Sequence, residues 1–151
     1  MPIQYAQLGH VAYLCNDIDV MEKFYIEKLD FRFSFMLNRD DGSPWLKFLV
    51  APSGQFLELF YANYPAKDNL AGQRSFQKFC LEVDDMAAAI QTLHERGVEL
   101  YSGPVKFGRR MPVPNPDQKT ALCGSYCAFL LDPEGNEVEI QQFTPNSLQL
   151  R

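Results

Sequence analysis

His10-Val-Ala-Tyr-Leu-Cys-Asn-Asp-Ile-Asp19 decides the fold of this chain, because a looser copy of it returns as Lys78-Phe-Cys-Leu-Glu-Val-Asp-Asp-Met-Ala87. Each copy begins as a short strand, continues with paired Asn or Asp residues that suit a helix N-cap, and ends in a helical pattern. A repeat of this size indicates two copies of one supersecondary unit. The sequence therefore predicts a domain built from two similar modules.

The first module is expected to span about residues 6–61, in the order strand, helix and three strands. Its predicted elements are a strand at Leu8–Cys15, a helix that ends near Lys28, and strands at Phe31–Met36, Trp45–Val50 and Gln55–Tyr61. Asn16, Asp17 and Asp19 offer oxygens for the helix N-cap, and Glu22 stands three residues after Asp19 as in a capping box. Asp41-Gly42 predicts a hairpin turn between the second and third strands.

The second module is expected at about residues 76–144, after a polar linker at about 62–75. Its predicted elements are a strand at Phe76–Val83, a helix capped by Asp84 or Asp85 and ended by Gly97, a strand at Val98–Tyr101, a proline-rich loop, and strands at Tyr126–Leu131 and Glu137–Phe143. Residues 1–151 are thus predicted to form a single α+β domain. Its two βαβββ modules are expected to form one cupped mixed sheet with the helices on the outer face.

A carboxylate stands between two apolar residues in the last strand of each module, in Leu57-Glu58-Leu59 and in Val138-Glu139-Ile140. Because side chains alternate along a strand, Glu58 and Glu139 should point away from the apolar face that the helices cover. The same alternation places His10 and Lys78 on the uncovered face. Phe56 and Phe60 flank Glu58, so its carboxylate is expected to be partly desolvated and to need a partner.

Composition excludes several classes of function. The net charge of −5 and the lack of a long basic run argue against a nucleic-acid partner. No run of about 18 apolar residues is present, and the N-terminus lacks the pattern of a signal peptide, so a cytoplasmic protein is expected. The four cysteines are then expected to be free thiols. Cys123-x-x-x-Cys127 does not have a standard zinc spacing.

The chain resembles the vicinal oxygen chelate superfamily, which includes glyoxalase I, bleomycin- and fosfomycin-resistance proteins, extradiol dioxygenases and methylmalonyl-CoA epimerase. The resemblance covers about residues 6–144. It is carried by Leu8-Gly9-His10-Val11-Ala12, by Glu82-Val83-Asp84-Asp85 and by Asp132-Pro133-Glu134-Gly135-Asn136-Glu137-Val138-Glu139. Fold alone does not select among the chemistries of such a superfamily. The match is nearest to glyoxalase I-like members.

The resemblance implies a divalent metal site, with one departure. Glyoxalase I-like members use His, Glu, His and Glu, which fall on His10, Glu58, Lys78 and Glu139 here. An ammonium group has no lone pair and cannot be a ligand. Either nickel, zinc or manganese binds weakly through His10, Glu58 and Glu139, or the Lys78 ammonium replaces the charge of the ion between the two carboxylates. Coulomb's law favours the second outcome, because one cation relieves the repulsion of both carboxylates.

Two functions from different classes stay open at this stage. A glyoxalase I-like lyase or isomerase would act on a small oxygenated substrate, with or without a thiol conjugate, through an enediolate. Glu139 and Glu58 would then move protons while Lys78 supplied electrophilic help. A non-catalytic binding protein would instead sequester an aromatic or planar small molecule in a cleft lined by Phe56 and Phe60. A third reading is an idle cleft with an ion-pair network. A homodimer is expected, with the modules paired within or between chains.

Overall fold

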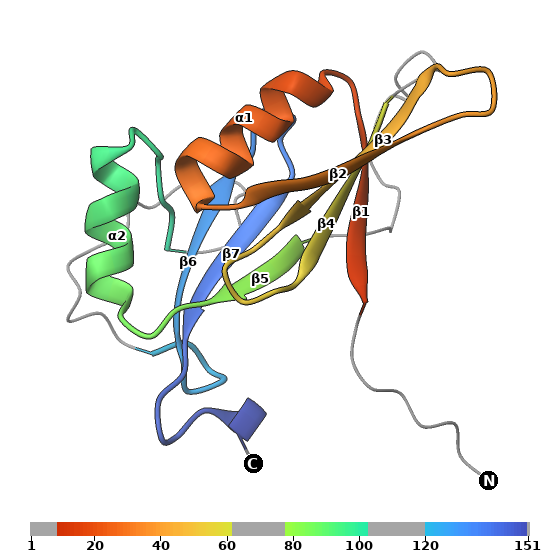
Figure 1. The fold of residues 1–151 in the computed structure, drawn as a ribbon. Coiled ribbons are helices and arrows are strands. Elements are labelled where there is room, and N and C mark those ends of the chain that lie inside the picture. Colours follow the sequence, from red (N-terminus) through yellow and green to blue (C-terminus); the bar gives the residue numbers. More distant parts are fainter. Residues whose placement is uncertain (1–8, 62–77, 103–119, 151) are drawn as a thin grey trace, which may run out of the picture. The chain divides into compact units, whose positions relative to one another are not determined.

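The computed structural model describes residues 9–61, 78–102 and 120–150 and divides into two compact units, Met1–Gln73 and Arg74–Arg151. Each unit holds one α-helix and one mixed β-sheet (Figure 1). The predicted α+β class with two related modules is confirmed. The predicted linker and most of the proline-rich loop lie outside the described residues. No helix in the described ranges is long and apolar enough to cross a membrane.

Unit 1 follows the predicted order of elements. They are β1 (His10–Cys15), α1 (Ile18–Leu29), β2 (Arg32–Asn38), β3 (Pro44–Val50) and β4 (Phe56–Tyr61). The strand order in the sheet is β1-β4-β3-β2, with β1 parallel to β4 and the other neighbours antiparallel. Both β1 and β2 are therefore edge strands, and the chain passes through α1, β2 and β3 between the parallel neighbours β1 and β4.

Asp17 is the N-cap of α1, because its carboxylate accepts hydrogen bonds from the backbone N–H groups of Asp19 and Val20. The predicted capping box with Glu22 is wrong. Glu22 instead pairs with the buried Lys47 ammonium from β3, which also lies 2.8 Å from the Asp19 carboxylate. Burial alone would lower the pKa of Lys47, but its hydrogen bonds to both carboxylates outweigh that effect and raise the pKa. Glu22 therefore forms a long-range ion pair with Lys47 in place of the predicted capping hydrogen bond.

The core of unit 1 forms where α1 covers one face of the sheet. Met21 and Tyr25 from the helix are fully buried, as are Leu49 and Leu59 from the sheet. These sheet residues alternate with Phe48 and Glu58, which are cross-strand partners in the ladder. Burial of each such side chain is worth about 1.5–3 kcal/mol. The helix therefore fixes which face of the sheet remains open.

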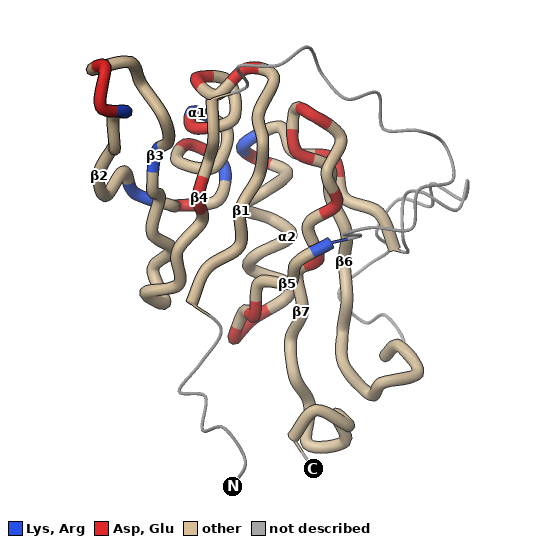
Figure 2. Tube along the Cα trace, turned by 90° about the vertical axis from the view of Figure 1, so that its right-hand side faces the viewer, with Lys and Arg blue, Asp and Glu red and all other residues tan. Residues whose placement is uncertain are grey.

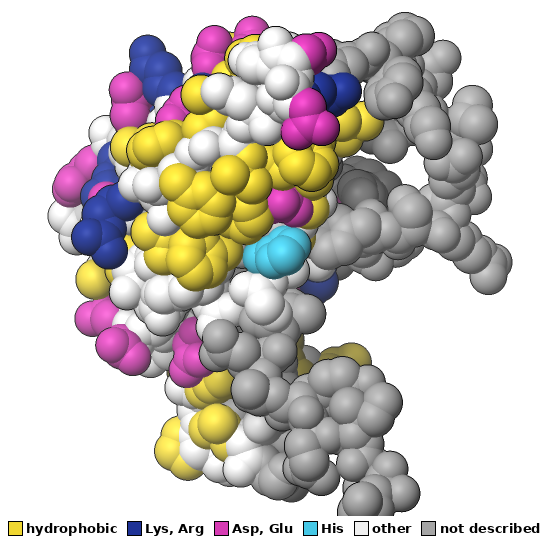
Figure 3. Space-filling view, turned by 45° about the vertical axis from the view of Figure 1, so that its right-hand side comes forward, with side chains coloured by type: hydrophobic (Ala, Val, Ile, Leu, Met, Phe, Trp, Pro, Cys, Tyr) yellow, Lys and Arg dark blue, Asp and Glu magenta, His cyan; other side chains and the backbone are white. Residues whose placement is uncertain are grey.

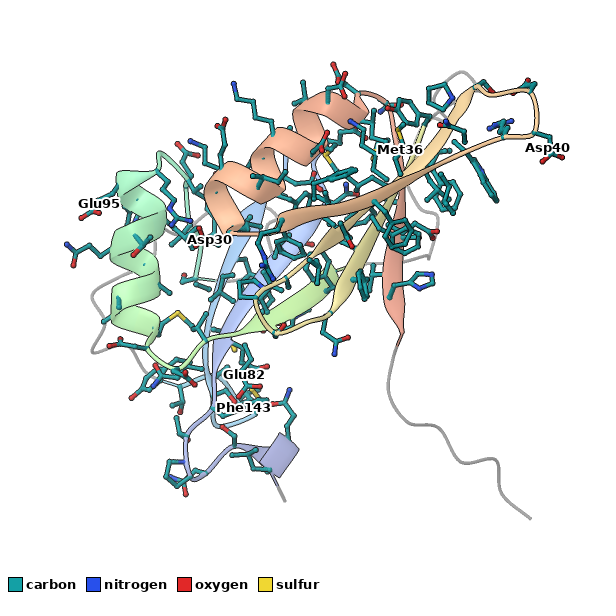
Figure 4. All side chains as sticks on the ribbon, in the orientation of Figure 1. Asp30, Met36, Asp40, Glu82, Glu95 and Phe143 are labelled. Atoms are coloured by element: carbon teal, nitrogen blue, oxygen red, sulfur yellow. The ribbon has the colours of Figure 1, made fainter. Side chains whose placement is uncertain are left out.

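The predicted hairpin turn between β2 and β3 is confirmed. Gly42 has φ +83, and its N–H donates to the Arg39 carbonyl at 2.9 Å. The Ser43 hydroxyl and backbone N–H both donate to the Asp41 carboxylate, which lowers the pKa of Asp41. Figure 4 shows Asp40 at the tip of this hairpin and Met36 on its β2 arm. Local hydrogen bonds thus stabilise the turn.

Unit 2 contains β5 (Lys78–Glu82), α2 (Met86–Glu95), β6 (Tyr126–Leu131), β7 (Glu137–Gln142) and a short 3₁₀ helix, η2 (Leu148–Leu150). The strand order is β5-β7-β6, with β5 parallel and β6 antiparallel to β7. Asp85 caps α2 by accepting from the Ala88 N–H, and Gly97 follows the helix with φ +75, both as predicted. Figure 4 shows Glu95 at the helix end.

The predicted strand at Val98–Tyr101 is wrong. Only Tyr101 pairs with β6, in an isolated antiparallel bridge to Phe129. The Val98 N–H instead donates to the Leu93 carbonyl and so completes the end of α2. The apolar side chains that suggested a strand, Val98 and Leu100, are buried. The backbone N–H of Val98, however, forms a hydrogen bond with the end of α2 and not with a neighbouring strand. Seven strands are thus formed in the described ranges, where eight were expected.

Candidate functional site

Each unit contains one basic side chain and one glutamate at the same offset in the register of its parallel strands. In unit 1 the β1–β4 register aligns His10 with Phe56, so Glu58 lies two positions further along the parallel partner. In unit 2 the β5–β7 register aligns Lys78 with Glu137, so Glu139 lies two positions further along. The sequence repeat is therefore also a repeat of pairing register. In each unit the first strand offers a basic group to the glutamate of the closing strand.

The unit 1 pair joins an accessible imidazole to a shielded carboxylate. His10 Nε2 lies 3.4 Å from Glu58 Oε2, with the His10 side chain 49% exposed and the Glu58 side chain 12% exposed. The His10 ring also meets Phe48 edge-on, with ring centroids 5.6 Å apart. This packing orients the imidazole. The imidazole nitrogen and the carboxylate oxygen therefore form a close polar pair on the open face of the sheet.

An aromatic surface surrounds Glu58 on the open face of the unit 1 sheet. It comprises the side chains of Phe35, Trp45, Phe48, Phe56 and Phe60. Phe35 stacks on Phe48 with centroids 4.5 Å apart, and Phe48 meets Phe56 at 6.0 Å. Trp45 meets Phe60 at 6.1 Å. Figure 3 shows hydrophobic side chains gathered on one face of the molecule beside a histidine and a carboxylate.

Part of the aromatic surface borders a groove of about 480 Å³. Its lining residues come from the ends of β1 and β4 and from the β2–β3 hairpin: Leu14, Asn38, Arg39, Asp40, Trp45, Phe60 and Tyr61. Sequence analysis found Phe56 and Phe60 but missed Phe48, which faces Glu58 directly across the β3–β4 ladder. The alternation of β3 relative to β4 was the signal that could have found it.

The unit 2 pair is tighter. Lys78 Nζ lies 2.6 Å from Glu139 Oε2, and the side chains are 30% and 12% exposed respectively. The same ammonium lies 4.7 Å from the centroid of the Phe129 ring. Phe129 is the ladder partner of Glu139, so both contacts lie on the same face of the unit 2 sheet. A carboxylate and an aromatic face together hold the cation in place.

Thiols complete the surroundings of Glu139. Burial and, after it, the charge of the nearby Glu139 carboxylate raise the pKa of the Cys80 thiol to about 12. Burial and the same carboxylate also raise the pKa of the Cys127 thiol, which donates to the Ser125 carbonyl at 3.9 Å. Both thiols are thus protonated at neutral pH. Sequence analysis did not find that the Cys127 thiol lies near Glu139.

The donors of unit 2 do not fit a divalent ion in this arrangement. The Lys78 ammonium takes the Glu139 oxygen that a metal would need, and its positive charge would repel the ion. His10 and Glu58 in unit 1 do offer a nitrogen and an oxygen close together. Across the ranges that the structure describes, no three His, Cys, Asp or Glu side chains form a metal-binding group.

Charge on the described surface is distributed without a basic stripe. Figure 2 shows Asp and Glu positions on helices, strands and turns, with Lys and Arg positions dispersed among them. A stripe of Lys and Arg along one face is what a nucleic-acid partner would require. A small molecule is the partner that the two pairs and the aromatic surface suit.

Comparison with known proteins gives consistent matches. A family model described as Glyoxalase/Bleomycin resistance protein/Dioxygenase superfamily matches residues 7–140. The chain is 22% identical over 136 residues to the uncharacterized protein YwkD of Bacillus subtilis, covering 89% of this chain and 95% of that protein. It superposes on a glyoxalase family protein from Enterococcus faecalis with a TM-score of 0.67 and 22% identity, covering 91% and 98% of the two chains.

A fosfomycin resistance protein, FosX from Listeria monocytogenes, was solved with Mn(II) and superposes with a TM-score of 0.61. It is 12% identical, and the alignment covers 96% of each chain. At these identities the structural matches show a shared fold, and they leave the chemistry of this chain to its own residues.

Proposed function

Since the chain belongs to the Glyoxalase/Bleomycin resistance protein/Dioxygenase superfamily, we propose that it is a glyoxalase I-like lyase or isomerase. Its substrate would be a small α-hydroxycarbonyl compound, such as the hemithioacetal of a 2-oxoaldehyde and a thiol. The observation that carries the proposal is the repeated base–glutamate pair in matching register, His10 with Glu58 and Lys78 with Glu139. An idle fold would not need a shielded carboxylate at both positions.

The proposed reaction moves one proton between adjacent carbons. One glutamate removes the proton from the carbon that bears the hydroxyl group, and the electron pair forms an enediolate with the neighbouring carbonyl. The proton then returns to that neighbouring carbon, while the hydroxyl proton passes to the former carbonyl oxygen, so that the hydroxyl and carbonyl groups exchange places. Glu139 and Glu58 are the acid–base groups, each shielded to 12% exposure. A positioned acid or base of this kind contributes about 10²–10⁴-fold to the rate.

Lys78 supports this chemistry through its charge. Its ammonium can donate to the substrate oxygen on which negative charge develops, while Glu139 and the Phe129 ring hold it in place. A divalent ion supplies this electrophilic help in metal-dependent members of the superfamily. In this chain we propose that a metal at His10, Glu58 and Glu139 is weakly held or absent, because Lys78 competes for Glu139.

Glu139→Gln is expected to lower kcat by about 10²–10⁴-fold, because the amide cannot accept the substrate proton. The test follows conversion of a hemithioacetal to its thioester in D₂O by proton NMR, in protein purified without an affinity tag. Glu58→Gln should also lower kcat. Glu95→Gln on the exposed surface of α2 is the matched control and should leave the rate unchanged. If the untagged wild-type protein catalyses neither conversion nor solvent exchange of the carbon-bound proton, the enzyme proposal fails.

The proposal includes a cytoplasmic homodimer. All four cysteines, at 15, 80, 123 and 127, are free thiols, as suits a reducing compartment. The two base–glutamate pairs would serve one substrate, with the modules paired either within a chain or between two chains. Sedimentation of the intact protein tests the oligomeric state, and a monomer would leave only pairing within the chain.

A second function, sequestration of a planar molecule without chemistry, is favoured by the aromatic surface. Trp45 is the single tryptophan of the chain and borders the groove beside Phe60. A planar aromatic ligand that binds there should quench the Trp45 fluorescence. Stacking of one ring contributes about 0.5–1.5 kcal/mol beyond area burial, so Phe60→Ala is expected to weaken binding roughly tenfold.

Fluorescence titration of wild type and Phe60→Ala with a panel of planar heteroaromatic compounds checks this expectation. Phe24→Ala is the matched control, because Phe24 packs on Tyr25 in α1, outside the aromatic surface. Quenching with equal affinity in wild type and Phe60→Ala would place the ligand elsewhere. Saturable binding without turnover of any α-hydroxycarbonyl compound would favour sequestration over catalysis.

A further inference from the structure

The groove beside Trp45 and Phe60 contains a cationic and an anionic residue next to each other in sequence. Arg39 and Asp40 both line it, and they lie at the tip of the β2–β3 hairpin. Figure 4 shows Asp40 at this tip. The proposed reaction uses neither of the two charges. The groove therefore offers a ligand an aromatic wall together with two opposite charges.

The turn fixes the backbone from which these charged side chains extend. The Arg39 N–H donates to the Ser43 carbonyl, and the Gly42 N–H donates to the Arg39 carbonyl, each at 2.9 Å. The Asp41 carboxylate accepts from the Ser43 hydroxyl at 2.6 Å and from the Ser43 N–H at 2.9 Å, so it stabilises the turn itself. Of the two adjacent acidic residues, Asp40 is thus the one that lines the groove.

Opposite charges side by side select the charge pattern of a ligand. A ligand with only a carboxylate would be attracted by Arg39 but repelled by Asp40 and the adjacent Asp41. A ligand with only an ammonium group would be repelled by Arg39. A group that carries both charges on one carbon atom can place its carboxylate against the guanidinium and its ammonium against the Asp40 carboxylate. An α-amino acid group has this pattern.

The groove continues the aromatic surface around Glu58. Phe60 lies two positions after Glu58 on the same face of β4, which is about 7 Å along the strand. Leu14, the ladder partner of Phe60 on β1, also lines the groove. One small molecule can therefore extend from Glu58 past Phe60 towards the hairpin tip.

We propose that this groove binds the α-amino acid end of a small-molecule ligand, with the ligand's carboxylate on Arg39, its ammonium on Asp40 and its carbon chain against Trp45 and Phe60. No bond forms or breaks in the groove. Binding there does not depend on the proposed isomerase chemistry. That the other end of the same ligand reaches Glu58 rests on the proposed function, and it would make the substrate an α-hydroxycarbonyl compound joined to an amino acid.

Four probes that share one nitrophenyl ring test the charge pattern. 4-Nitro-L-phenylalanine carries both charges, 3-(4-nitrophenyl)propanoic acid only the carboxylate, 4-nitrophenethylamine only the ammonium, and 2-(4-nitrophenyl)ethanol neither. The nitrophenyl ring quenches tryptophan fluorescence, so titration of the full-length protein reports binding beside Trp45, its single tryptophan. Saturable quenching is expected, with nitrophenylalanine bound at least about tenfold more tightly than each other probe, the factor that one hydrogen bond to a charged group contributes.

Two substitutions that remove one charge each assign the contacts. Arg39→Gln should weaken binding of nitrophenylalanine and of the propanoic acid about tenfold without weakening binding of the amine. Asp40→Asn should weaken binding of nitrophenylalanine and of the amine without weakening binding of the propanoic acid. Arg32→Gln is the matched control, because it removes an exposed cation from the first residue of β2, and it should bind all four probes as wild type does.

The groove assignment is wrong if the propanoic acid or the amine binds as tightly as nitrophenylalanine, or if both variants bind nitrophenylalanine with wild-type affinity. Quenching that rises linearly without saturation would also contradict it, because collisions with Trp45, which is 40% exposed, need no groove. The expected selectivity without turnover of any α-hydroxycarbonyl compound would support the groove and contradict the isomerase. Turnover without this selectivity would contradict the groove alone.

Discussion

Lys78→His is expected to raise the affinity for Ni²⁺ or Zn²⁺ by more than about 100-fold. An outer-shell change alters metal affinity by about 10- to 100-fold, and this substitution adds a ligand to the first shell. It also removes the ammonium that takes Glu139 Oε2 at 2.6 Å. Without added metal the variant should be less stable than wild type, because Glu139 is 12% exposed and loses its cation. Calorimetric titration of untagged protein measures the affinity, and thermal unfolding measures the stability.

Two further variants separate the causes of that gain. Lys78→Gln removes the positive charge without adding an imidazole, so it should recover only a small part of the affinity. Lys78→His combined with His10→Ala should lose most of the gain if groups from unit 1 and unit 2 hold the same ion. An unchanged affinity in Lys78→His would mean that this position is not part of a metal cage. If the double variant keeps the gain in metal affinity, the ion binds to unit 2 without His10.

Much of the fold could be predicted because its signals are local. The alternation that buries Leu57 and Leu59 while Glu58 points away is encoded in three adjacent residues. The Asp85 cap of α2 and the left-handed Gly97 after it are likewise set by neighbours in sequence. Such elements need no knowledge of distant partners, so a single sequence is sufficient to place them.

One error came from an ion pair that is distant in sequence, and the other from the way in which a helix ends. Glu22 was expected to cap its own helix, but Lys47 on β3 offers a buried cation that needs two carboxylates. The segment from Val98 was expected to be a strand, but its first N–H completes the end of α2. Local patterns allowed both outcomes in each case. The buried Lys47 ammonium decided the first outcome, and the end of the preceding helix decided the second.

The candidate site was likewise predicted in part, from strand alternation, and missed in part. Strand alternation predicted that His10 would share a face with Glu58 and that Lys78 would share one with Glu139, and each pair lies in contact. Their catalytic and metal-binding roles stay predictions. The Phe129 ring beneath Lys78 and the Phe48 ring beside His10 were missed. Both come from the antiparallel neighbours of the glutamate strands, whose register cannot be read from the repeat.

Gly124→Ala is expected to destabilise the protein by about 2–5 kcal/mol. Left-handed backbone costs a non-glycine residue about 1–2 kcal/mol, and Gly124 has φ +82. The new Cβ would also lie 2.4 Å from the Asn146 carbonyl oxygen, a backbone atom. Overpacking of this kind adds about 1–3 kcal/mol. The Asn146 segment cannot easily withdraw, because the Thr144 hydroxyl donates to the Gly124 carbonyl at 2.7 Å and the buried Ser125 and Ser147 hydroxyls share a hydrogen bond.

Gly135→Ala is the matched control, because Gly135 has φ +81 but nothing within 4 Å of the added Cβ. Gly135→Ala should incur only the cost of the left-handed backbone. The difference in the free energy of unfolding between the two variants therefore measures the clash of the Gly124→Ala side chain with Asn146. Denaturation followed by far-UV circular dichroism measures both free energies of unfolding. Trp45 fluorescence reports on unit 1, so coincidence of the two transitions tells whether unit 2 unfolds with it. Equal destabilisation by the two alanines would show that the turn moves away from Asn146 freely.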